Sequence, residues 1–142
     1  MAGGTTLTIV KPDAFNSGKA GKVIAHLEQD GFKVVTARVL HMTEAQAGAF
    51  YEVHMERPFF GSLVKFMTSG PCMPMVLEKD NAVVSLRDAI GATDPAEAAE
   101  GTVRKLFAES KERNAIHASD SDDNAARESR FFFSEAELIA AR

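Results

Sequence analysis

Four short strand-like runs, separated by segments of helical periodicity, constrain the fold of this chain more than any other feature. The runs lie at residues 5–10, 32–40, 73–77 and 114–117, and helical spacing of apolar residues marks 18–30, 43–56, 60–67, 81–89 and 102–110. Strands interleaved with helices in this order predict an α+β fold. We expect a ferredoxin-like βαββαβ arrangement, in which helices pack on a four-stranded antiparallel sheet. The 142 residues fit one domain, residues 1–142.

Several boundaries between these elements can be read from local chemistry. Lys11-Pro12-Asp13 predicts a turn that stops the first strand, and Asn81 is a candidate N-cap for the helix that follows the third strand. Ser119 or Asp120 is a candidate N-cap for a last, acid-rich helix. The connection at residues 91–114 is unusually long, and connections of that length in compact domains are usually functional or disordered.

Composition argues against several classes of protein. Acidic residues outnumber basic ones by 20 to 16, and no block of lysine and arginine supplies the basic surface that nucleic-acid binding requires as a main role. Cys72 is the only cysteine, so no internal disulfide forms. The N-terminus has no signal-peptide pattern, and no apolar run approaches the ~20 residues of a membrane helix. We expect a cytoplasmic protein that is not in a membrane.

Familiar nucleotide-binding and metal-binding motifs are missing. The P-loop pattern does not occur, because the segment Gly18–Lys22 has the wrong spacing and continues into Val23. The protein-kinase motif set is also absent. The four histidines show no zinc-ligand spacing, and a single cysteine makes a structural zinc site improbable.

His117 is the histidine best placed for chemistry. It ends a short strand and precedes the acid-rich helix, and strand-to-helix junctions present reactive groups in sheets of this kind. A neutral imidazole is available at physiological pH and is an effective nucleophile when its second nitrogen is oriented by an acceptor, for which Glu128 is the candidate. The position alone fits a structural histidine bonded to a backbone carbonyl equally well. Lys11, Arg87, Arg104 and Asn114 are each ambiguous in the same way, as solvated charges or a turn residue.

Together these residues resemble the nucleoside diphosphate kinase family. Residues 114–121, Asn-Ala-Ile-His-Ala-Ser-Asp-Ser, are similar to the family signature N-x-x-H-[GA]-S-D-S. Four further blocks follow the family's order and spacing: 9–13 (IVKPD), 57–60 (RPFF), 68–71 (TSGP) and 91–95 (GATDP). The resemblance covers roughly residues 5–135.

The resemblance implies ping-pong transfer of the γ-phosphate from a nucleoside triphosphate such as ATP to a nucleoside diphosphate, which maintains the (d)NTP pools. It implies that His117 becomes a phosphohistidine through Nδ1, that Glu128 bonds the other ring nitrogen, and that Ser119 bonds the glutamate. The remaining implied contacts are those to phosphate and ribose (Lys11, Arg87, Thr93, Arg104 and Asn114), to the transferring phosphate (Tyr51) and to the base (Phe59). Mg²⁺ is held mainly by the nucleotide's phosphates, with Asp120 reaching it through water.

The chain departs from the family pattern in the loop that faces the nucleotide. Glu100 replaces a frequent proline, Lys105-Leu106 replaces a small residue and an acid, and Lys111-Glu112 replaces apolar residues or glycine. The chain ends at Arg142, short of the tail with which longer relatives contact neighbouring subunits. The resemblance therefore implies a homo-oligomer, with a tetramer favoured and a hexamer as the alternative.

Two other functions remain as alternatives at this point. The first is a binding or regulatory module that uses the same fold without turnover, because a fold alone does not decide function. Such a module is expected to lose the nucleophile or a phosphate contact, and this chain keeps all of them. The second is nucleic-acid binding, which the missing basic surface argues against.

Overall fold

The computed structural model describes residues 3–141; Met1, Ala2 and Arg142, which the expected domain 1–142 includes, lie outside the described part. The four strands are β1 (Thr5–Val10), β2 (Lys33–Ala37), β3 (Met73–Glu78) and β4 (Ile116–Ala118). They form one sheet in the order β2-β3-β1-β4, and all three neighbouring pairs are antiparallel. The predicted α+β fold with a four-stranded antiparallel sheet is confirmed.

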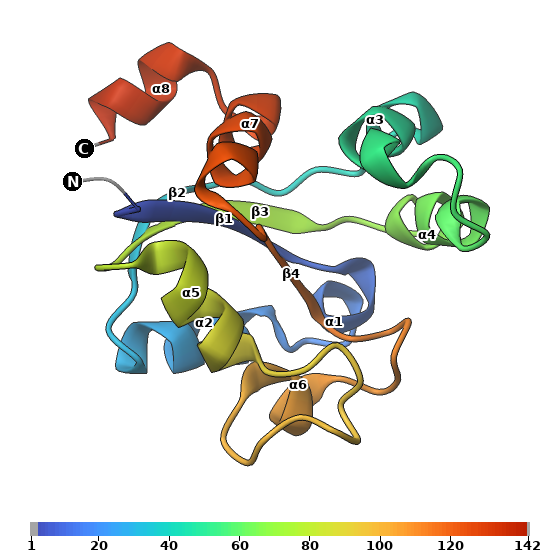
Figure 1. Cartoon of the computed structure of the whole chain (residues 1–142), viewed down its shortest axis with the longest axis horizontal. Coiled ribbons are helices and arrows are strands. Elements are labelled where there is room, and N and C mark those ends of the chain that lie inside the picture. Colours follow the sequence, from blue (N-terminus) through green and yellow to red (C-terminus); the bar gives the residue numbers. More distant parts are fainter. Residues whose placement is uncertain (1–2, 142) are drawn as a thin grey trace.

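Helices cover both faces of the sheet (Figure 1). On one side lie α3 (Glu44–Phe50), α4 (Phe60–Met67), α7 (Asp122–Phe132) and α8 (Glu135–Ala140), with the 3-10 turn η1 (Glu52–His54) between α3 and α4. On the other side lie α1 (Pro12–Asn16), α2 (Ala20–Gln29), α5 (Ala82–Ile90) and α6 (Val103–Phe107). No helix in the described part of the chain has the length and apolar character needed to cross a membrane.

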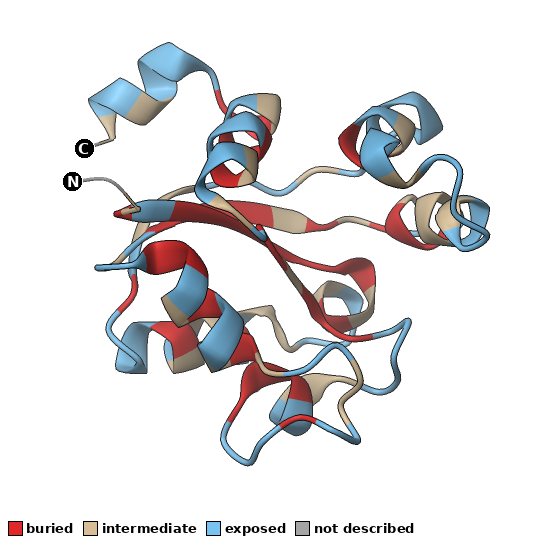
Figure 2. Ribbon diagram, viewed as in Figure 1, coloured by how far each residue is buried: buried red, intermediate tan, exposed pale blue. Residues whose placement is uncertain are grey.

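The central strand β1 explains why the core has two halves. Its side chains alternate between faces, so Leu7 and Ile9 join the apolar cluster under α3, α4 and α7, whereas Val10 joins the cluster over α2 and α5. Every residue of β1 after Thr5 is buried, as the red central strand in Figure 2 shows, whereas β2 at the edge of the sheet is exposed or half-buried. A strand whose sheet is covered by helices on both faces has buried side chains at consecutive positions.

Local chemistry sets some helix ends as expected. Thr43 begins α3 with a full capping box, in which its hydroxyl accepts from the backbone of Gln46 and the Gln46 side chain accepts from the backbone of Thr43. Ser134 begins α8 in the same way with Glu137. Each box satisfies two backbone N–H groups that the first turn would otherwise leave unpaired.

Asn81 and Lys11-Pro12-Asp13 lie at the expected boundaries but differ from expectation in local structure, and the expected cap of the last acid-rich helix was wrong. Asn81 precedes α5 but has φ of 51°, in the left-handed region, and its side chain makes no capping hydrogen bond. The cap of α7 is Ser121, not Ser119 or Asp120, because the Ser119 hydroxyl is buried and bonded to Glu128. Lys11-Pro12-Asp13 is the start of α1 rather than a plain turn, since proline is well suited to the first helical position.

The strand expected at residues 32–40 is shorter than predicted. β2 ends at Ala37, its pairing with β3 shifts register between Val34 and Thr36, and Leu40 makes only an isolated bridge to Cys72. The last strand begins at Ile116 rather than Asn114. The residues just before it form a tight turn that leads into the candidate site.

Candidate active site

His117 is the middle residue of β4, where it pairs with Ile9 of β1. Its neighbours Ile116 and Ala118 are buried in the cluster over α2 and α5, so the His117 ring projects to the opposite face, toward α3 and α7. The hydroxyl of Thr8 donates to the His117 carbonyl over 2.7 Å. The backbone beneath the ring is therefore fixed by the central strand.

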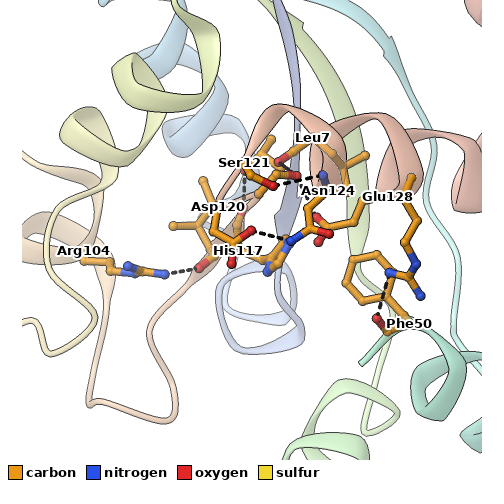
Figure 3. Close-up of polar contacts among 12 residues, drawn as sticks. Leu7, Phe50, Arg104, His117, Asp120, Ser121, Asn124 and Glu128 are labelled. Carbon is orange, nitrogen blue, oxygen red and sulfur yellow. Dashed lines mark hydrogen bonds and ion pairs between the residues drawn. The ribbon is translucent and has the colours of Figure 1, made fainter. Parts of the chain in front are cut away.

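Glu128 of α7 orients the ring. His117 Nε2 lies 2.7 Å from Glu128 Oε1, and the Ser119 hydroxyl donates to the same oxygen over 2.7 Å (Figure 3). A carboxylate can only accept, so Nε2 carries the proton and Nδ1 keeps its lone pair. Glu128 and Ser119 are both buried, which holds the acceptor in one place. The arrangement presents Nδ1 as a nucleophile.

Two aromatic rings enclose the histidine on the α3 side. The centroid of Phe50 lies 5.4 Å from that of the His117 ring and the centroid of Tyr51 lies 6.2 Å away, both edge-on. The Tyr51 hydroxyl is buried and has no hydrogen-bond partner among the described residues. Burial, with smaller contributions from Cys72 and Glu128, raises the pKa of Tyr51 well above its usual value. Tyr51 is therefore a neutral phenol beside the ring.

A strained turn delivers the chain to the nucleophile. Ala115 has φ of 74°, and the backbone N–H of Ile116 donates to the Asn114 carbonyl over 2.9 Å, which closes a three-residue γ-turn. The N–H of Ala115 donates to Asp13 Oδ2 over 3.0 Å. Residues in this region of backbone space cost about 1–3 kcal/mol and persist only when their surroundings hold them. Asp13 is one of the groups that hold this turn.

Lys11 and Asn114 form a buried polar pair on the other side of that turn. Lys11 Nζ donates to Asn114 Oδ1 over 2.9 Å, and Asn114 Nδ2 donates to the Thr93 carbonyl over 3.3 Å. Burial lowers the pKa of Lys11 to about 8, and the nearby charge of Arg104 acts in the same direction, while Asp13 and Glu112 oppose it. This cation needs an anion to compensate its lost hydration.

Arg104 of α6 is a second buried cation near β4. Its guanidinium donates to the Ile116 carbonyl over 2.8 Å and to the Gly91 carbonyl over 3.0 Å, while its buried Nε has no partner among the described residues. Burial and the charge of Arg87 lower the pKa of Arg104 to about 10, so it stays charged at neutral pH. Arg87 itself is exposed on α5.

These cations border a cavity of about 440 Å³ between α5, α6 and the loop that joins them. Arg87, Thr93 and Arg104 are among its lining residues. The volume falls within the range of small-molecule sites. The carboxylates of Asp88 and Glu97 also line the cavity, so the two guanidinium groups, rather than the net charge of the wall, are what suits a phosphate chain.

Asp120 lies at the rim, one turn before α7. Its pKa is lowered mainly by a hydrogen bond from Asn124 (Nδ2 to Oδ1, 2.6 Å), with help from the charges of Arg87 and His117. It is thus an ionised, exposed carboxylate at neutral pH. The described residues contain no group of three or more acidic, histidine or cysteine side chains that could hold a metal. The donors fit a Mg²⁺ ion that brings most of its ligands with a nucleotide.

Phe59 stands apart from the buried groups. It precedes α4, its side chain is 49% exposed, and its ring lies 5.5 Å from the ring of His54. The structure thus brings ten of the expected residues into one region around β4, α5, α6 and α7, and places Phe59 at an exposed outer end. An exposed aromatic face is available to stack on a base.

Sequence reasoning missed several contributors. Asp13 was expected only as a turn residue, and Thr8 and Phe50 only as parts of a strand and a helix. Arg127 of α7 was not expected to contribute; its guanidinium donates to the carbonyls of Ala49 and Phe50 and so fixes the end of α3 beside His117 (Figure 3). No sequence motif predicts these contacts, because each contact joins segments that are distant in the chain.

Comparison with known proteins places this chain in a class of nucleotide phosphotransferases. The family model described as nucleoside diphosphate kinase matches residues 4–138. The nucleoside diphosphate kinase of Chlorobium chlorochromatii is 60% identical over 134 residues, which cover 94% of this chain and 96% of the relative. That of Chlorobaculum parvum is 57% identical with the same coverage.

Solved structures support the same family assignment. The Aquifex aeolicus nucleoside diphosphate kinase superposes with a TM-score of 0.92 at 45% identity, covering 94% of this chain and 97% of that one. A nucleoside diphosphate kinase family protein from Babesia bovis gives 0.88 at 34% identity, covering 94% and 90%. The chain belongs to the nucleoside diphosphate kinase family, and it is an enzyme with that activity, a kinase acting on nucleotides.

Proposed function

We propose that this enzyme works by ping-pong transfer through a phosphohistidine on His117. The lone pair of Nδ1 attacks the γ-phosphorus of a nucleoside triphosphate such as ATP. The bond from that phosphorus to the bridging oxygen breaks, and the nucleoside diphosphate leaves with the electron pair. A β-phosphate oxygen of a second nucleoside diphosphate then attacks the phosphorus, and the N–P pair returns to Nδ1. The 2.7 Å bond from Nε2 to Glu128 is the observation that carries this proposal.

The residues around His117 divide the remaining work. The Nε2 proton stays on the ring throughout, and the Glu128 carboxylate, fixed by Ser119, stabilises the positive charge of the phosphorylated imidazole. The Tyr51 hydroxyl donates to the transferring phosphate. Phosphoryl transfer asks the protein mainly for positioning and charge stabilisation. In this proposal the phosphates and ribose are held by Lys11, Arg87, Thr93, Arg104 and Asn114, and the base stacks on Phe59.

Mg²⁺ is the proposed cofactor. When bound with the nucleotide, it neutralises phosphate charge and orients the phosphates. The ionised carboxylate of Asp120 would reach it through water, and the lack of a three-ligand cluster in the described residues fits an ion that the nucleotide carries.

The wider setting is proposed from the family. We propose that residues 1–142 act as one domain in a cytoplasmic homo-oligomer, with a tetramer favoured over a hexamer. Its substrates would be nucleoside di- and triphosphates, and its role the maintenance of (d)NTP pools. A light-scattering mass decides between the two assemblies.

The covalent route has a direct test. The protein is mixed with radiolabelled ATP and Mg²⁺ without acceptor, and labelled protein is expected that loses its label in acid and keeps it in alkali, as phosphohistidine does. Adding GDP should discharge the label into GTP. A correctly folded wild type that turns over but never carries label would exclude the phosphohistidine.

A further inference from the structure

Two segments far apart in the sequence meet at the exposed end of the nucleotide site. The hydroxyl of Ser62 on α4 donates to Glu112 Oε1 over 2.5 Å, across 50 positions of sequence. The next residue, Arg113, places its guanidinium 5.7 Å from the centroid of the Phe66 ring, also on α4. The loop at residues 108–114, which leads from α6 to β4 at the same end of the molecule as α4 (Figure 1), is therefore tied to that helix by two adjacent side chains.

Each end of the Ser62–Glu112 bond connects to a nucleotide contact. Ser62 lies three positions after Phe59, and residues three apart share one side of a helix. Glu112 lies two positions before Asn114, whose amide bonds both Lys11 and the Thr93 carbonyl. The bond therefore spans from the proposed base contact to the proposed phosphate contacts.

The loop has few other ties at its tip. Residues 109–113 are exposed, and their own hydrogen bonds run within the loop, from the N–H groups of Glu109 and Ser110 to the Arg113 carbonyl and from the Arg113 N–H to the Ser110 hydroxyl. These bonds shape the loop but do not fix its distance from α4. That distance depends on Ser62–Glu112 and on the weaker Arg113–Phe66 contact.

We propose that Glu112, held by Ser62, is a positioning residue that sets the separation between Phe59 and Asn114 before a nucleotide binds. A nucleoside di- or triphosphate must place its base on Phe59 and its phosphates near Asn114 at once, so a fixed separation lowers the ordering cost of binding. The inference rests on the nucleotide contacts proposed above. Position 112 is also where the chain departs from the family's usual apolar residue or glycine.

The test compares Ser62→Ala and Glu112→Ala with wild type in a steady-state ATP and GDP assay at about pH 6.5, well below the Lys11 pKa of about 8, so that loss of the Glu112 charge leaves Lys11 protonated in every variant. Each variant is expected to raise KM for both nucleotides about two- to tenfold, with kcat within about twofold, because one hydrogen bond contributes about 0.5–1.5 kcal/mol. Both positions are exposed, so the melting temperature is expected to match wild type.

Two further variants distinguish the Ser62–Glu112 hydrogen bond from the negative charge of Glu112. Glu112→Gln keeps an acceptor oxygen for Ser62 but removes the charge, and it is expected to restore KM to near the wild-type value. Glu109→Gln removes the same charge from the same loop, and the Glu109 side chain makes no hydrogen bond to a described residue; its KM is expected to stay unchanged. A wild-type KM in Ser62→Ala, or a KM in Glu112→Gln as high as in Glu112→Ala, would overturn the proposal.

The outcome is distinct from that of the catalytic proposal. If the Ser62 and Glu112 variants have a wild-type KM while wild type still forms the acid-labile phosphoprotein, only the positioning role fails. If wild type never carries the label, the phosphohistidine route fails, and the KM comparison still reports on the loop.

Discussion

His117 and Phe59 mark the two ends of the proposed nucleotide site, and the chain holds them in different ways. Around His117 the supporting groups are buried: Glu128 bonds the ring, the Ser119 hydroxyl donates to Glu128, and the Thr8 hydroxyl donates to the His117 carbonyl. Phe59 is half exposed, and its helix is joined to the loop across the site by the exposed Ser62–Glu112 hydrogen bond and the Arg113–Phe66 contact.

The difference matches what each end has to do. Transfer of a phosphoryl group requires the nucleophile within a few tenths of an ångström of its productive position, which a packed, fully bonded shell provides. A base needs only a flat face, and every base has one. An exposed Phe59 with few contacts is therefore compatible with accepting many nucleotides. A loosely held His117 would not be compatible with rapid transfer.

The largest effect should come from removing the nucleophile. His117→Ala is expected to lower kcat by about 10⁴-fold or more, because the covalent route is lost. The variant should still fold, with a lower melting temperature, because the ring contacts Phe50 and Tyr51 and its loss leaves the buried Glu128 without a partner. The assay is ATP and GDP turnover together with acid-labile labelling. His41→Ala is the matched control, an exposed histidine bonded to the Thr68 carbonyl, and should keep full activity. Residual ATP-to-GDP transfer in His117→Ala near the wild-type rate would contradict the covalent route.

A smaller loss is expected when the ring loses its acceptor. Glu128→Ala should lower kcat by about 10²-fold, the size of effect typical of a positioned catalytic group, while nucleotide affinity stays close to wild type. Single-turnover labelling by ATP separates this chemical step from binding, which calorimetry measures. An unchanged labelling rate would mean that another group orients the ring.

The buried cation predicts a pH effect on the phosphate contacts. With a pKa lowered to about 8, Lys11 loses its charge as pH rises through that value, so kcat/KM should fall up to about tenfold per unit above it. Lys11→Arg stays charged and should lack this limb. Glu112 raises the pKa of Lys11, so in Glu112→Gln the limb should move to lower pH. A wild-type profile flat to pH 10 would show that Lys11 does not serve binding.

The lowered pKa of Lys11 also affects the free energy of unfolding, and the direction of the effect follows from the protons that each state binds. Between pH 8 and the ordinary value of 10.5, the unfolded chain holds a proton that the folded chain has released. The contribution of Lys11 to the free energy of unfolding therefore rises with pH in that window and is least favourable below it. Thermal melts of wild type and Lys11→Arg across pH 7–10.5 measure this difference.

The smallest effect should fall at the base end. Phe59→Ala is expected to raise KM about fivefold, at the low end of base stacking because the ring is half exposed, and to do so equally for diphosphates of all four bases. Kinetics with each nucleotide provide the measurement. A rise confined to one base would show that Phe59 reads base identity rather than offering a flat surface.

Sequence reasoning succeeded where the controlling interactions are local. The strand at residues 5–10 and the helix that begins after Thr43 depend on neighbours within a few positions, and both were predicted correctly. Ser119 shows the limit: its local context favours a helix cap, but its hydroxyl is taken by Glu128 nine positions later. The cap then falls to Ser121.

In the candidate site, too, residues within sequence motifs were predicted, whereas contacts between distant segments were not. The signature around His117 pointed to the nucleophile and to Ser119, because these residues lie in one recognisable block, and the resemblance over the rest of the chain pointed to Glu128. The residues that hold the site in place were not predicted from the sequence. Asp13 reaches Ala115 across 102 positions and Ser62 reaches Glu112 across 50, and only the folded chain brings such pairs together. The identity of a serine or an aspartate says nothing about which distant group it will bond.

The brevity of β4 has a consequence for how this protein can change over evolutionary time. The strand has three residues, and in it His117 alternates with Ile116 and Ala118, which lie in the opposite core. Losing or gaining one residue between Asn114 and Ser119 would shift that alternation and turn the imidazole toward α2 and α5. Length changes are tolerated in many loops of such a domain, but this stretch admits substitution without admitting insertion or deletion.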